Sequence, residues 1–420
     1  MLTCGSPAAT TEVIQTSRHP SWRRVTAVVL AGGTSQRFAP DKLAEPVDGK
    51  PLLERTLASL PEDFQVVVVG SVRDVDLPVI FTREDPPGGG PAAAMIAGVR
   101  RALAESADVI VVLPADAPLA GQAARTLLNR LEDGWSTLAV VGVDAHGREQ
   151  PLQLALRPAG AEALLTAAGP GSAAGVSARR LLDALRPGLV TQELAPAELW
   201  DIDTADQLLV WRLRSSAAVL SIMDVIADHQ AAAPGAPVVV AIDGPSCAGK
   251  SILATALALR SRAAVVEGDD FYRHTLPRLT VAEREAMSDA AVVDAVIDWE
   301  RLRAEALLPL QARESARFQP YDWDADDGRL APPKIIPPAD VIIVEGVYAA
   351  RPELADLVDV AVYLGVDRQV RARRYAERGN DPDWQRFWER GEAHYFRAIR
   401  PAASFHIRLD DQDLRNVGGA

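Results

Sequence analysis

The chain has 420 residues, of which 48% are hydrophobic and 24% are charged, and it carries only two cysteines. This length predicts two or three domains, and the composition excludes global disorder and fibrous repeats. The formal net charge of −13 gives no overall field that would attract nucleic acid or anionic lipid, so phosphate binding must come from local cationic clusters. Cys4 and Cys247 cannot form a disulfide framework, which fits a reducing compartment.

The start of the chain lacks the pattern of a targeting segment. Glu12 stands where a signal peptide would have its apolar stretch, and no uncharged apolar run approaches the ~18 residues of a membrane span. We expect residues 1–22 to be disordered. The protein is predicted to be cytoplasmic, to act on small molecules, and to have neither nucleic acid nor membrane as a partner; the sequence leaves its oligomeric state open.

Short apolar runs alternate with helical stretches over residues 23–214, the first predicted domain. The expected strands are Val25–Leu30, Gln65–Val69, Val109–Leu113 and Thr137–Val141, and the expected helices are Pro51–Leu60, Pro91–Ala104 and Gly121–Leu131. Such alternation is typical of a mostly parallel sheet with helices on both faces.

A helical pattern from about residue 204 to 230 then enters AAAPGAP, so residues 215–235 are predicted to be a helix and linker. The alternation restarts in a second domain, residues 236–420. Its expected strands are Pro237–Ile242, Ala263–Val266, Val341–Val344 and Val360–Leu364, with helices after Gly249, Pro352 and Asp367. The predicted fold class is α/β, with two doubly wound, mostly parallel sheet domains.

The second domain opens with GPSCAGKS directly after its first strand, which satisfies the pattern G-x-x-x-x-G-K-[ST] of a P-loop. In that context Lys250 reaches the β- and γ-phosphates and the Ser251 hydroxyl binds Mg²⁺. A plain glycine-rich turn is the alternative. Glu345, at the end of a later strand, is a second candidate for the metal. The predicted nucleotide-binding residues are Gly244, Pro245, Ser246, Cys247, Ala248, Gly249, Lys250 and Ser251.

Two carboxylates in EGDDFYR follow the second strand of this domain, where a hydroxyl that accepts phosphate would lie. Asp269, Phe271 and Tyr272 fit the D-x-F-Y motif of the uridine kinase family, which this region resembles over residues 236–410. The resemblance implies a P-loop NTPase fold and makes Asp269 the catalytic base, with Asp270 as the runner-up. FQPYDWD resembles the family's nucleoside-binding segment, so Asp270, Tyr272 and Tyr321 are expected to contact substrate.

An arginine-rich stretch, DRQVRARRYAERGND, places Arg371, Arg374 and Arg378 on one face of a predicted helix. A solvated helix face is the ordinary explanation of such a cluster. The stretch also resembles the lid of the same kinases. The resemblance implies a catalytic role for Arg373 and nucleotide contact for Arg378.

The first domain carries VVLAGGTSQRFAPDKL after its first strand, with Gly32-Gly33 followed by the cations Arg37 and Lys42. This segment resembles the signature of MobA-like nucleotidyltransferases, which have a Rossmann-like fold. The resemblance implies catalytic roles for Arg37 and Lys42, and it extends to DPPGGGPAAAM and VVLPADAPL. The nucleotide-binding residues it implies are Leu30, Ala31, Gly32, Gly33, Gly88, Gly89 and Gly90.

Asp116 ends a predicted strand where the MobA-like family holds Mg²⁺, and Asp203 is a possible second metal group. A helix cap is the alternative for Asp116 alone. Gly32-Gly33 stands where the family's cytidylyl branch has Ala-Gly, so the resemblance implies GTP in preference to CTP as the nucleotide.

The sequence therefore predicts a bifunctional enzyme. One domain would transfer a nucleotidyl group from GTP (or CTP) to a phosphorylated acceptor, and the other would use ATP to phosphorylate a small, nucleoside-like hydroxyl compound, both with Mg²⁺. The alternative is a nucleotide-binding sensor or assembly protein in which one or both sites are inactive.

Overall fold

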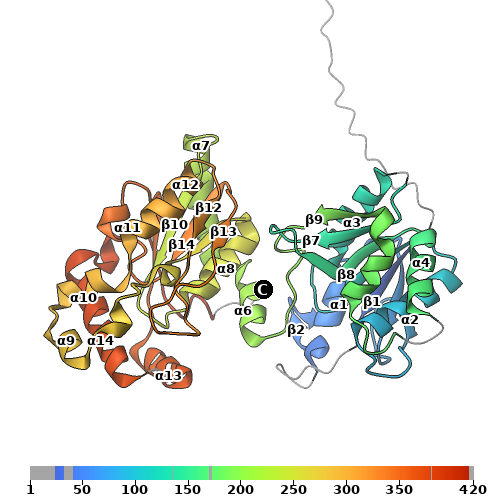
Figure 1. Cartoon of the computed structure of the whole chain (residues 1–420), viewed down its shortest axis with the longest axis horizontal. Coiled ribbons are helices and arrows are strands. Elements are labelled where there is room, and N and C mark those ends of the chain that lie inside the picture. Colours follow the sequence, from blue (N-terminus) through green and yellow to red (C-terminus); the bar gives the residue numbers. More distant parts are fainter. Residues whose placement is uncertain (1–23, 33–40, 135, 170–172, 380, 416–420) are drawn as a thin grey trace, which may run out of the picture.

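The computed structural model describes residues 24–32, 41–134, 136–169, 173–379 and 381–415, and the structural statements below concern these residues. The predicted disordered segment 1–22 lies outside them. Two α/β units follow each other along the chain, each built around its own sheet (Figure 1). The predicted fold class is confirmed.

The first sheet has seven strands in the order β5-β4-β1-β6-β8-β7-β9. Strands β5, β4, β1 and β6 are parallel, whereas β8 runs antiparallel to both of its neighbours. The chain fills one side of β1 and then crosses to the other, which makes the carboxyl end of β1 a switch point suited to ligand binding. The strands are β1 (Val25–Leu30), β4 (Gln65–Val69), β5 (Ile80–Thr82), β6 (Val109–Pro114), β7 (Ala139–Val143), β8 (Glu149–Leu156) and β9 (Leu189–Glu193).

The second sheet has five strands, all parallel, in the order β11-β14-β10-β15-β16. Its first strand again lies in the middle, so a second switch point falls at the carboxyl end of β10. The strands are β10 (Val238–Asp243), β11 (Ala264–Glu267), β14 (Val341–Glu345), β15 (Val360–Leu364) and β16 (Ile407–Leu409). Two small antiparallel pairs stand apart from the main sheets: β2 (Pro46–Val47) with β3 (Lys50–Pro51), and β12 (Ala316–Phe318) with β13 (Lys334–Ile336).

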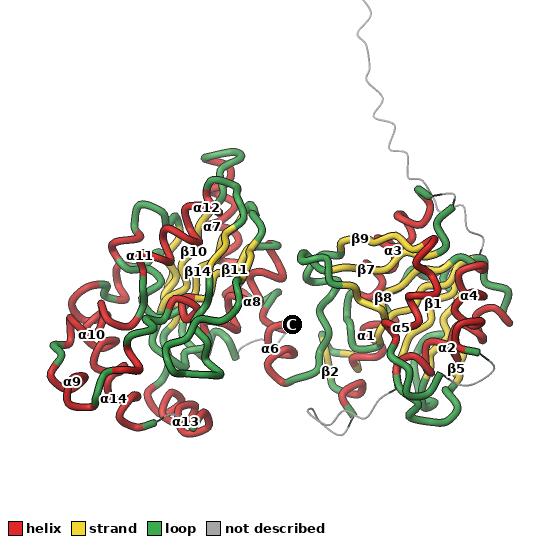
Figure 2. The backbone as a smooth tube through the Cα atoms, in the orientation of Figure 1, coloured by secondary structure: helices red, strands yellow, loops and turns green. Residues whose placement is uncertain are grey.

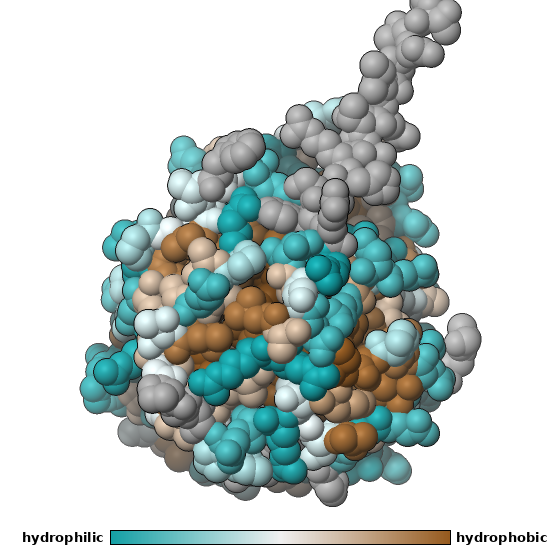
Figure 3. Space-filling model, turned by 90° about the vertical axis from the view of Figure 1, so that its right-hand side faces the viewer, coloured by the Kyte–Doolittle hydropathy of each residue, from teal (hydrophilic) through white to brown (hydrophobic). Residues whose placement is uncertain are grey.

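Helices cover both faces of each sheet, as Figure 2 shows. Alternate residues of a central strand therefore enter different hydrophobic clusters: Ala27 belongs to one cluster and Val28 to another, and Val239 and Val240 are separated in the same way. This two-sided burial explains why the strands read as continuous apolar runs. The surface seen in Figure 3 mixes hydrophilic and hydrophobic patches.

The helices of the first unit are α1 (Leu52–Leu57), α2 (Pro91–Ala104), α3 (Ala120–Glu132), α4 (Pro158–Ala168) and α5 (Ala178–Leu182). Those of the second are α8 (Lys250–Ser261), α9 (Val281–Ala286), α10 (Asp289–Val296), α11 (Trp299–Arg301), α12 (Leu308–Gln311), α13 (Arg368–Arg378) and α14 (Pro382–His394). Among the described residues no helix is both long enough and apolar enough to cross a membrane.

Helix α6 (Ala205–Leu213) joins the two units (Figure 1). Trp211 is fully buried in a cluster of the first unit, whereas Val210 and Leu213 belong to a cluster of the second. Helix α7 (Ala217–Ala232) packs on the second unit as well, and the Pro- and Gly-rich segment 231–237 leads from it into β10.

Two helix predictions need correction. The pattern over 204–230 is two helices, because the Ser216 side chain accepts a hydrogen bond from the Val219 N–H and starts a new helix there. The helix expected after Pro352 is only a 3₁₀ turn, Pro352–Leu354.

Candidate active sites

A cleft of about 640 Å³ opens at the carboxyl ends of the first sheet's parallel strands. Leu30, Ala31 and Gly32 line it directly after β1, and Gly70 and Pro114 border it at the ends of the neighbouring strands. The cleft therefore lies at the switch point where the sequence predicts nucleotide binding. Gly33 and Arg37, also predicted to belong to this site, lie outside the described residues.

Lys42 pairs with two aspartates that line this cleft. The Lys42 Nζ is 2.5 Å from Asp116 Oδ2 and 2.5 Å from Asp203 Oδ1, although 161 residues separate Lys42 from Asp203. A backbone hydrogen bond of 3.1 Å from the Ile202 N–H to the Asp116 carbonyl brings the two acidic segments together. Asp116 is not a helix cap, because Leu119 is the N-cap residue of α3.

The charges in this cluster affect one another. Burial alone would lower the pKa of Lys42, but the Asp116 and Asp203 carboxylates outweigh burial and raise the pKa. A third acid, Asp201, also lines the cleft, and burial together with the charges of Asp116 and Asp203 raises its pKa. Three carboxylates, those of Asp116, Asp201 and Asp203, thus lie in one part of the cleft beside Lys42, and oxygen donors of this kind suit a bound cation.

The glycine-rich turn forms another wall of the cleft. Gly88 and Gly90 line it and have φ angles of +77° and +93°, conformations that favour glycine. Gly89 does not line it; a Cβ on Gly89 would stand 2.9 Å from the Ala93 Cβ, so this glycine allows the turn to pack on α2. Two lining residues, Glu84 and Arg73, were not predicted from the sequence, since neither lies in a recognisable motif.

A second cleft, of about 440 Å³, opens beside the P-loop of the other unit. The loop starts and ends on glycines with φ of +153° at Gly244 and +104° at Gly249. A Cβ on Gly244 would lie 2.2 Å from the Leu364 carbonyl oxygen, so the loop can pass β15 only because this residue is glycine. Lys250 begins α8 and is 8% exposed, with its Nζ 3.1 Å from the Pro245 carbonyl. Of the eight predicted loop residues, Ser246 and Ser251 line the cleft.

Buried side chains outside the motif hold the P-loop. Asp243 is fully buried and accepts hydrogen bonds from the Gly244 N–H at 2.7 Å and the Tyr395 hydroxyl at 2.9 Å. The Arg374 guanidinium donates to the Cys247 carbonyl at 2.6 Å. Glu392 accepts from the Ser246 hydroxyl at 2.5 Å and also pairs with Arg371. These contacts fix the conformation of the loop.

Ser251 and Glu345, the two predicted metal residues of this unit, lie together. The Ser251 hydroxyl donates to Glu345 Oε1 at 2.9 Å. Burial, helped by the charge of Asp269 and opposed by that of Lys250, raises the pKa of Glu345 to about 7.

Asp269 and Asp270 both line the cleft but differ in their partners. The Asp270 carboxylate is buried and pairs with the Lys334 Nζ at 2.8 Å. Asp269 is exposed and makes no side-chain hydrogen bond to another described residue. Asp269 is therefore the carboxylate that is free to meet an acceptor.

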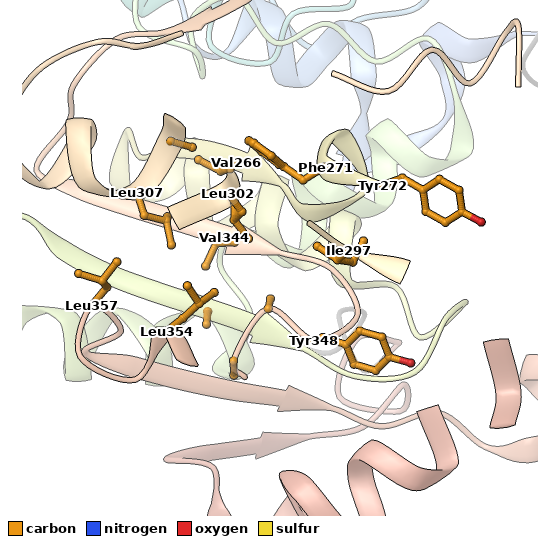
Figure 4. Close-up of a cluster of buried hydrophobic side chains, with 14 of the residues drawn as sticks. Val266, Phe271, Tyr272, Ile297, Leu302, Leu307, Val344, Tyr348, Leu354 and Leu357 are labelled. Carbon is orange, nitrogen blue, oxygen red and sulfur yellow. The ribbon is translucent and has the colours of Figure 1, made fainter. Parts of the chain in front are cut away.

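Aromatic side chains form the far wall of this cleft. Tyr272 and Trp323 line it with ring centroids 4.9 Å apart. Figure 4 shows Tyr272 and Tyr348 at one end of a buried cluster, with their hydroxyls directed away from the aliphatic residues at its other end. Tyr321, a predicted substrate residue, does not line the cleft; it is 2% exposed, supports the rings of Tyr272 and Trp323, and donates its hydroxyl to Asp326 at 2.7 Å.

The arginines of α13 divide by helix face. Arg378 lines the cleft, whereas Arg371 and Arg374 hold Glu392 and the P-loop. Arg373 is exposed and does not line the cleft, which departs from the catalytic role predicted for it. The reason is the helical period, because a residue two positions after Arg371 points roughly 200° away from it.

The donor atoms in both clefts suit magnesium. Carboxylate and hydroxyl oxygens are its preferred ligands, and it is commonly held by one or two carboxylates together with substrate phosphates. No cluster of three or more His, Cys, Asp or Glu side chains fit for a metal ion occurs in the described part of the chain, so phosphate oxygens would have to complete either site.

The described chain thus has two α/β units, each with a cleft at the switch point of its sheet. Residues 27–188 match the MobA-like NTP transferase domain, and residues 239–403 match the phosphoribulokinase / uridine kinase family. The chain therefore belongs to the MobA-like NTP transferases through its first part, and its second part matches the phosphoribulokinase / uridine kinase family. The resemblances predicted from the motifs are confirmed.

Curated relatives match one part of the chain or the other. A molybdenum cofactor guanylyltransferase of Acidiphilium cryptum is 30% identical over 171 residues, which are 38% of this chain and 82% of the relative. A probable molybdenum cofactor guanylyltransferase of Haloferax mediterranei is 33% identical over 115 residues, which are 25% of this chain and 53% of the relative, about half of its length. Uridine kinase-like protein 3 of Arabidopsis thaliana is 27% identical over 148 residues, or 34% of this chain and 31% of the relative.

Solved structures also resemble the two parts. A possible uridine kinase from Bacillus stearothermophilus is 21% identical with a TM-score of 0.34, and the match covers 45% of this chain and all of that one. Molybdopterin-guanine dinucleotide biosynthesis protein A from Archaeoglobus fulgidus is 20% identical with a TM-score of 0.34, covering 44% of this chain and 94% of that one.

Proposed function

We propose that the chain is a bifunctional enzyme, a nucleotidyltransferase joined to an ATP-dependent kinase. The observation that carries this proposal is that each cleft lies at the switch point of its sheet, is lined by acidic side chains suited to a metal, and adjoins a lysine and a glycine-rich loop. Binding alone would not require the free Asp269 carboxylate in the second cleft.

In the first cleft, a phosphomonoester oxygen of the acceptor attacks the α-phosphorus of a nucleoside triphosphate, and pyrophosphate leaves. Leu30, Ala31 and Gly32 lie where the nucleotide passes the end of β1. Lys42 stabilises the negative charge that develops on the phosphates. Asp116 and Asp203 would hold Mg²⁺, which supplies further charge neutralisation when bound.

In the second cleft, a substrate hydroxyl attacks the γ-phosphorus of ATP, and ADP leaves. Asp269 accepts the hydroxyl proton, Lys250 binds the phosphates, and Arg378 lies at the cleft to offset their charge. Ser251 and Glu345 would hold Mg²⁺, which would supply neutralisation of the phosphate charge. The wall of Tyr272 and Trp323 suits an acceptor with a flat, apolar face, such as a nucleoside-like compound.

Mass spectrometry of a small-metabolite mixture incubated with the full chain, Mg²⁺, ATP, GTP and CTP tests both activities. We expect phosphorylated metabolites that disappear with Lys250→Ala and NDP-linked metabolites that disappear with Lys42→Ala. Each variant serves as the control for the other. Bound nucleotide without any product would contradict the enzyme and support a sensor or assembly role.

The two reactions can run in series, because a kinase makes a phosphomonoester and this kind of nucleotidyltransferase consumes one. Full-length protein supplied with ATP, GTP and the hydroxyl compound that its kinase accepts should then form an NDP-linked product. Accumulation of the phosphorylated intermediate without that product would show that the two domains act on unrelated substrates.

A further inference from the structure

The second unit contains a buried arginine whose charge has no carboxylate partner. Arg284, on α9, is 8% exposed. Its Nη1 donates to the Leu279 carbonyl at 2.7 Å, and its Cζ lies 3.9 Å from the centre of the Trp384 ring, but no ion pair joins it to a described residue. A charge removed from water without a partner of opposite sign is costly. Arg284 therefore calls for an anion from outside the described chain.

Other arginines of this unit show how the chain balances such a charge. Arg351 is 3% exposed and pairs with Asp294 at 3.0 Å and with Glu353 at 2.9 Å. Arg371 is partly buried and pairs with Glu392. Carboxylates of the chain thus balance these two arginines, whereas Arg284 lacks such a partner.

A cavity of about 260 Å³ adjoins Arg284 between α9 and α14. The two helices pack side by side (Figure 1). Two further arginines of α14, Arg386 and Arg390, also line this cavity, and none of its lining residues lines either nucleotide cleft. The remaining lining residues are Val281, Glu285, Asp383 and Phe387.

The partners of the two α14 arginines leave N–H groups for a ligand. Arg386 pairs with Asp383 on the same helix, and its side chain is 66% exposed. Arg390 uses its Nε for Asp289 at 3.1 Å and its Nη2 for the Met287 carbonyl at 2.6 Å. A guanidinium carries five N–H donors, and exposed ion pairs are weak, so these contacts permit a further anion.

Three guanidinium groups around one small cavity suit a tetrahedral oxyanion. A phosphate group presents three or four oxygens to them, whereas a carboxylate presents only two, and guanidinium binds phosphate through paired N–H donors. The cavity is smaller than either nucleotide cleft, and Glu285 and Asp383 on its wall repel additional negative charge. We propose that this cavity is a phosphate-binding site separate from both clefts, which takes inorganic phosphate or the phosphate group of a small phosphomonoester.

The position of the cavity gives a bound phosphate a structural effect. Trp388 and Glu392 line the kinase cleft from another face of α14, and Glu392 accepts a hydrogen bond from the P-loop residue Ser246. A phosphate between α9 and α14 joins α9 to this supporting helix. Because the cavity exists only in the folded unit, binding also stabilises the fold.

The test measures phosphate binding to the full chain by calorimetry without Mg²⁺. The parent protein carries Lys42→Ala and Lys250→Ala, which weaken phosphate binding in the two clefts. Inorganic phosphate, glycerol 3-phosphate and acetate are compared at one ionic strength. We expect one or both phosphate compounds to bind saturably, at least about tenfold tighter than acetate, and to raise the melting temperature. The tighter of the two shows whether free phosphate or a phosphomonoester is the ligand.

Substitutions in the cavity should weaken this binding selectively. Arg284→Gln should weaken it by about tenfold or more, and Arg386→Gln by about three- to tenfold. Arg386 is exposed, so its change tests the site without disturbing the core, whereas the melting temperature of Arg284→Gln without phosphate shows whether the fold is kept. Arg101→Gln, which removes an arginine with a carboxylate partner on α2, is the matched control and should bind phosphate as the parent does.

Three results would overturn the site or its ligand. Absence of saturable phosphate binding, or equal losses in Arg386→Gln and Arg101→Gln, would mean that the cavity holds no phosphate. Acetate bound as tightly as phosphate would overturn the ligand class. None of these results bears on the proposed kinase or nucleotidyltransferase, because both clefts are weakened in the parent protein from the start.

Discussion

The two clefts hold their lysines in different ways. Lys42 lies against two carboxylates, at 2.5 Å from each, whereas Lys250 is nearly buried and contacts a backbone carbonyl at 3.1 Å. In the second cleft Lys250 forms no ion pair with Asp269, which lines the cleft without a side-chain hydrogen bond to another described residue. In the first cleft Lys42, proposed to bind phosphate, is ion-paired with Asp116 and Asp203, which are proposed to bind the metal. Binding and chemistry should therefore be separable by mutation in the kinase and inseparable in the nucleotidyltransferase.

The largest effect is expected from Asp269→Asn in the kinase. The amide cannot accept the substrate proton, so turnover should fall by about 10²–10⁴-fold, the range typical of losing a general base. The affinity for ATP, measured by calorimetry, should stay close to that of the parent because Lys250 and the P-loop are untouched.

Asp270→Asn is the matched control for Asp269→Asn. Asp270 is already paired with Lys334, so its amide variant should lose less turnover. A greater loss in Asp270→Asn than in Asp269→Asn would transfer the role of base to Asp270, and an equal loss of ATP binding in either would break the proposed separation.

A smaller effect, about 10²-fold on nucleotide affinity, is expected from Asp116→Ala in the first cleft with Mg²⁺ present. Without Mg²⁺ the same variant should bind nucleotide at least as well as the parent, because Lys42 loses one of its two competing carboxylates. Asp203→Ala should show a weaker form of both effects, since its side chain is 52% exposed against 20% for Asp116. Equal losses with and without Mg²⁺ would mean that Asp116 supports the fold and not a metal.

The sequence predicted the features that local patterns encode. Buried strands such as Val25–Leu30 and Val360–Leu364 were located from apolar runs, and the P-loop from its fixed spacing. It could not show that Lys42 meets Asp203, because that contact joins segments 161 residues apart through the packing of the sheet. The antiparallel strand β8 was not among the predicted strands, and its pairing direction depends on its neighbours in the sheet.

Supporting residues escaped prediction for a related reason. Asp243 and Glu392 hold the P-loop, yet neither lies in a motif with fixed spacing, and one is on β10 while the other is on α14. For Arg373, in contrast, the resemblance implied a role that the position of its side chain does not support. The family resemblance placed an arginine in the right helix, but only the helix orientation reveals that Arg378 faces the cleft and Arg373 does not.

The smallest expected effect is a change of nucleotide affinity with pH, and its origin should differ between the two clefts. The pKa of Glu345 is raised to about 7, so near pH 6 this carboxyl is mostly protonated, unlike an ordinary glutamic acid. A metal held there with ATP favours the ionised form, and its binding must expel the proton below pH 7. The affinity of the kinase for Mg·ATP should therefore rise by up to about tenfold from pH 6 to pH 8. Calorimetry in two buffers of different ionisation enthalpy measures the released proton directly.

Glu345→Gln separates this effect from the titration of ATP itself, which is the same for both proteins. The variant should bind Mg·ATP more weakly at pH 8, and its affinity should change less with pH than that of the parent. An unchanged pH dependence would mean that Glu345 gives up no proton when the nucleotide binds, and that Ser251 is its partner for structural reasons alone. In the first cleft Asp201 is the acid whose pKa is raised, through burial and through Asp116 and Asp203, so the pH dependence there should respond to Asp201→Asn and not to Glu345→Gln.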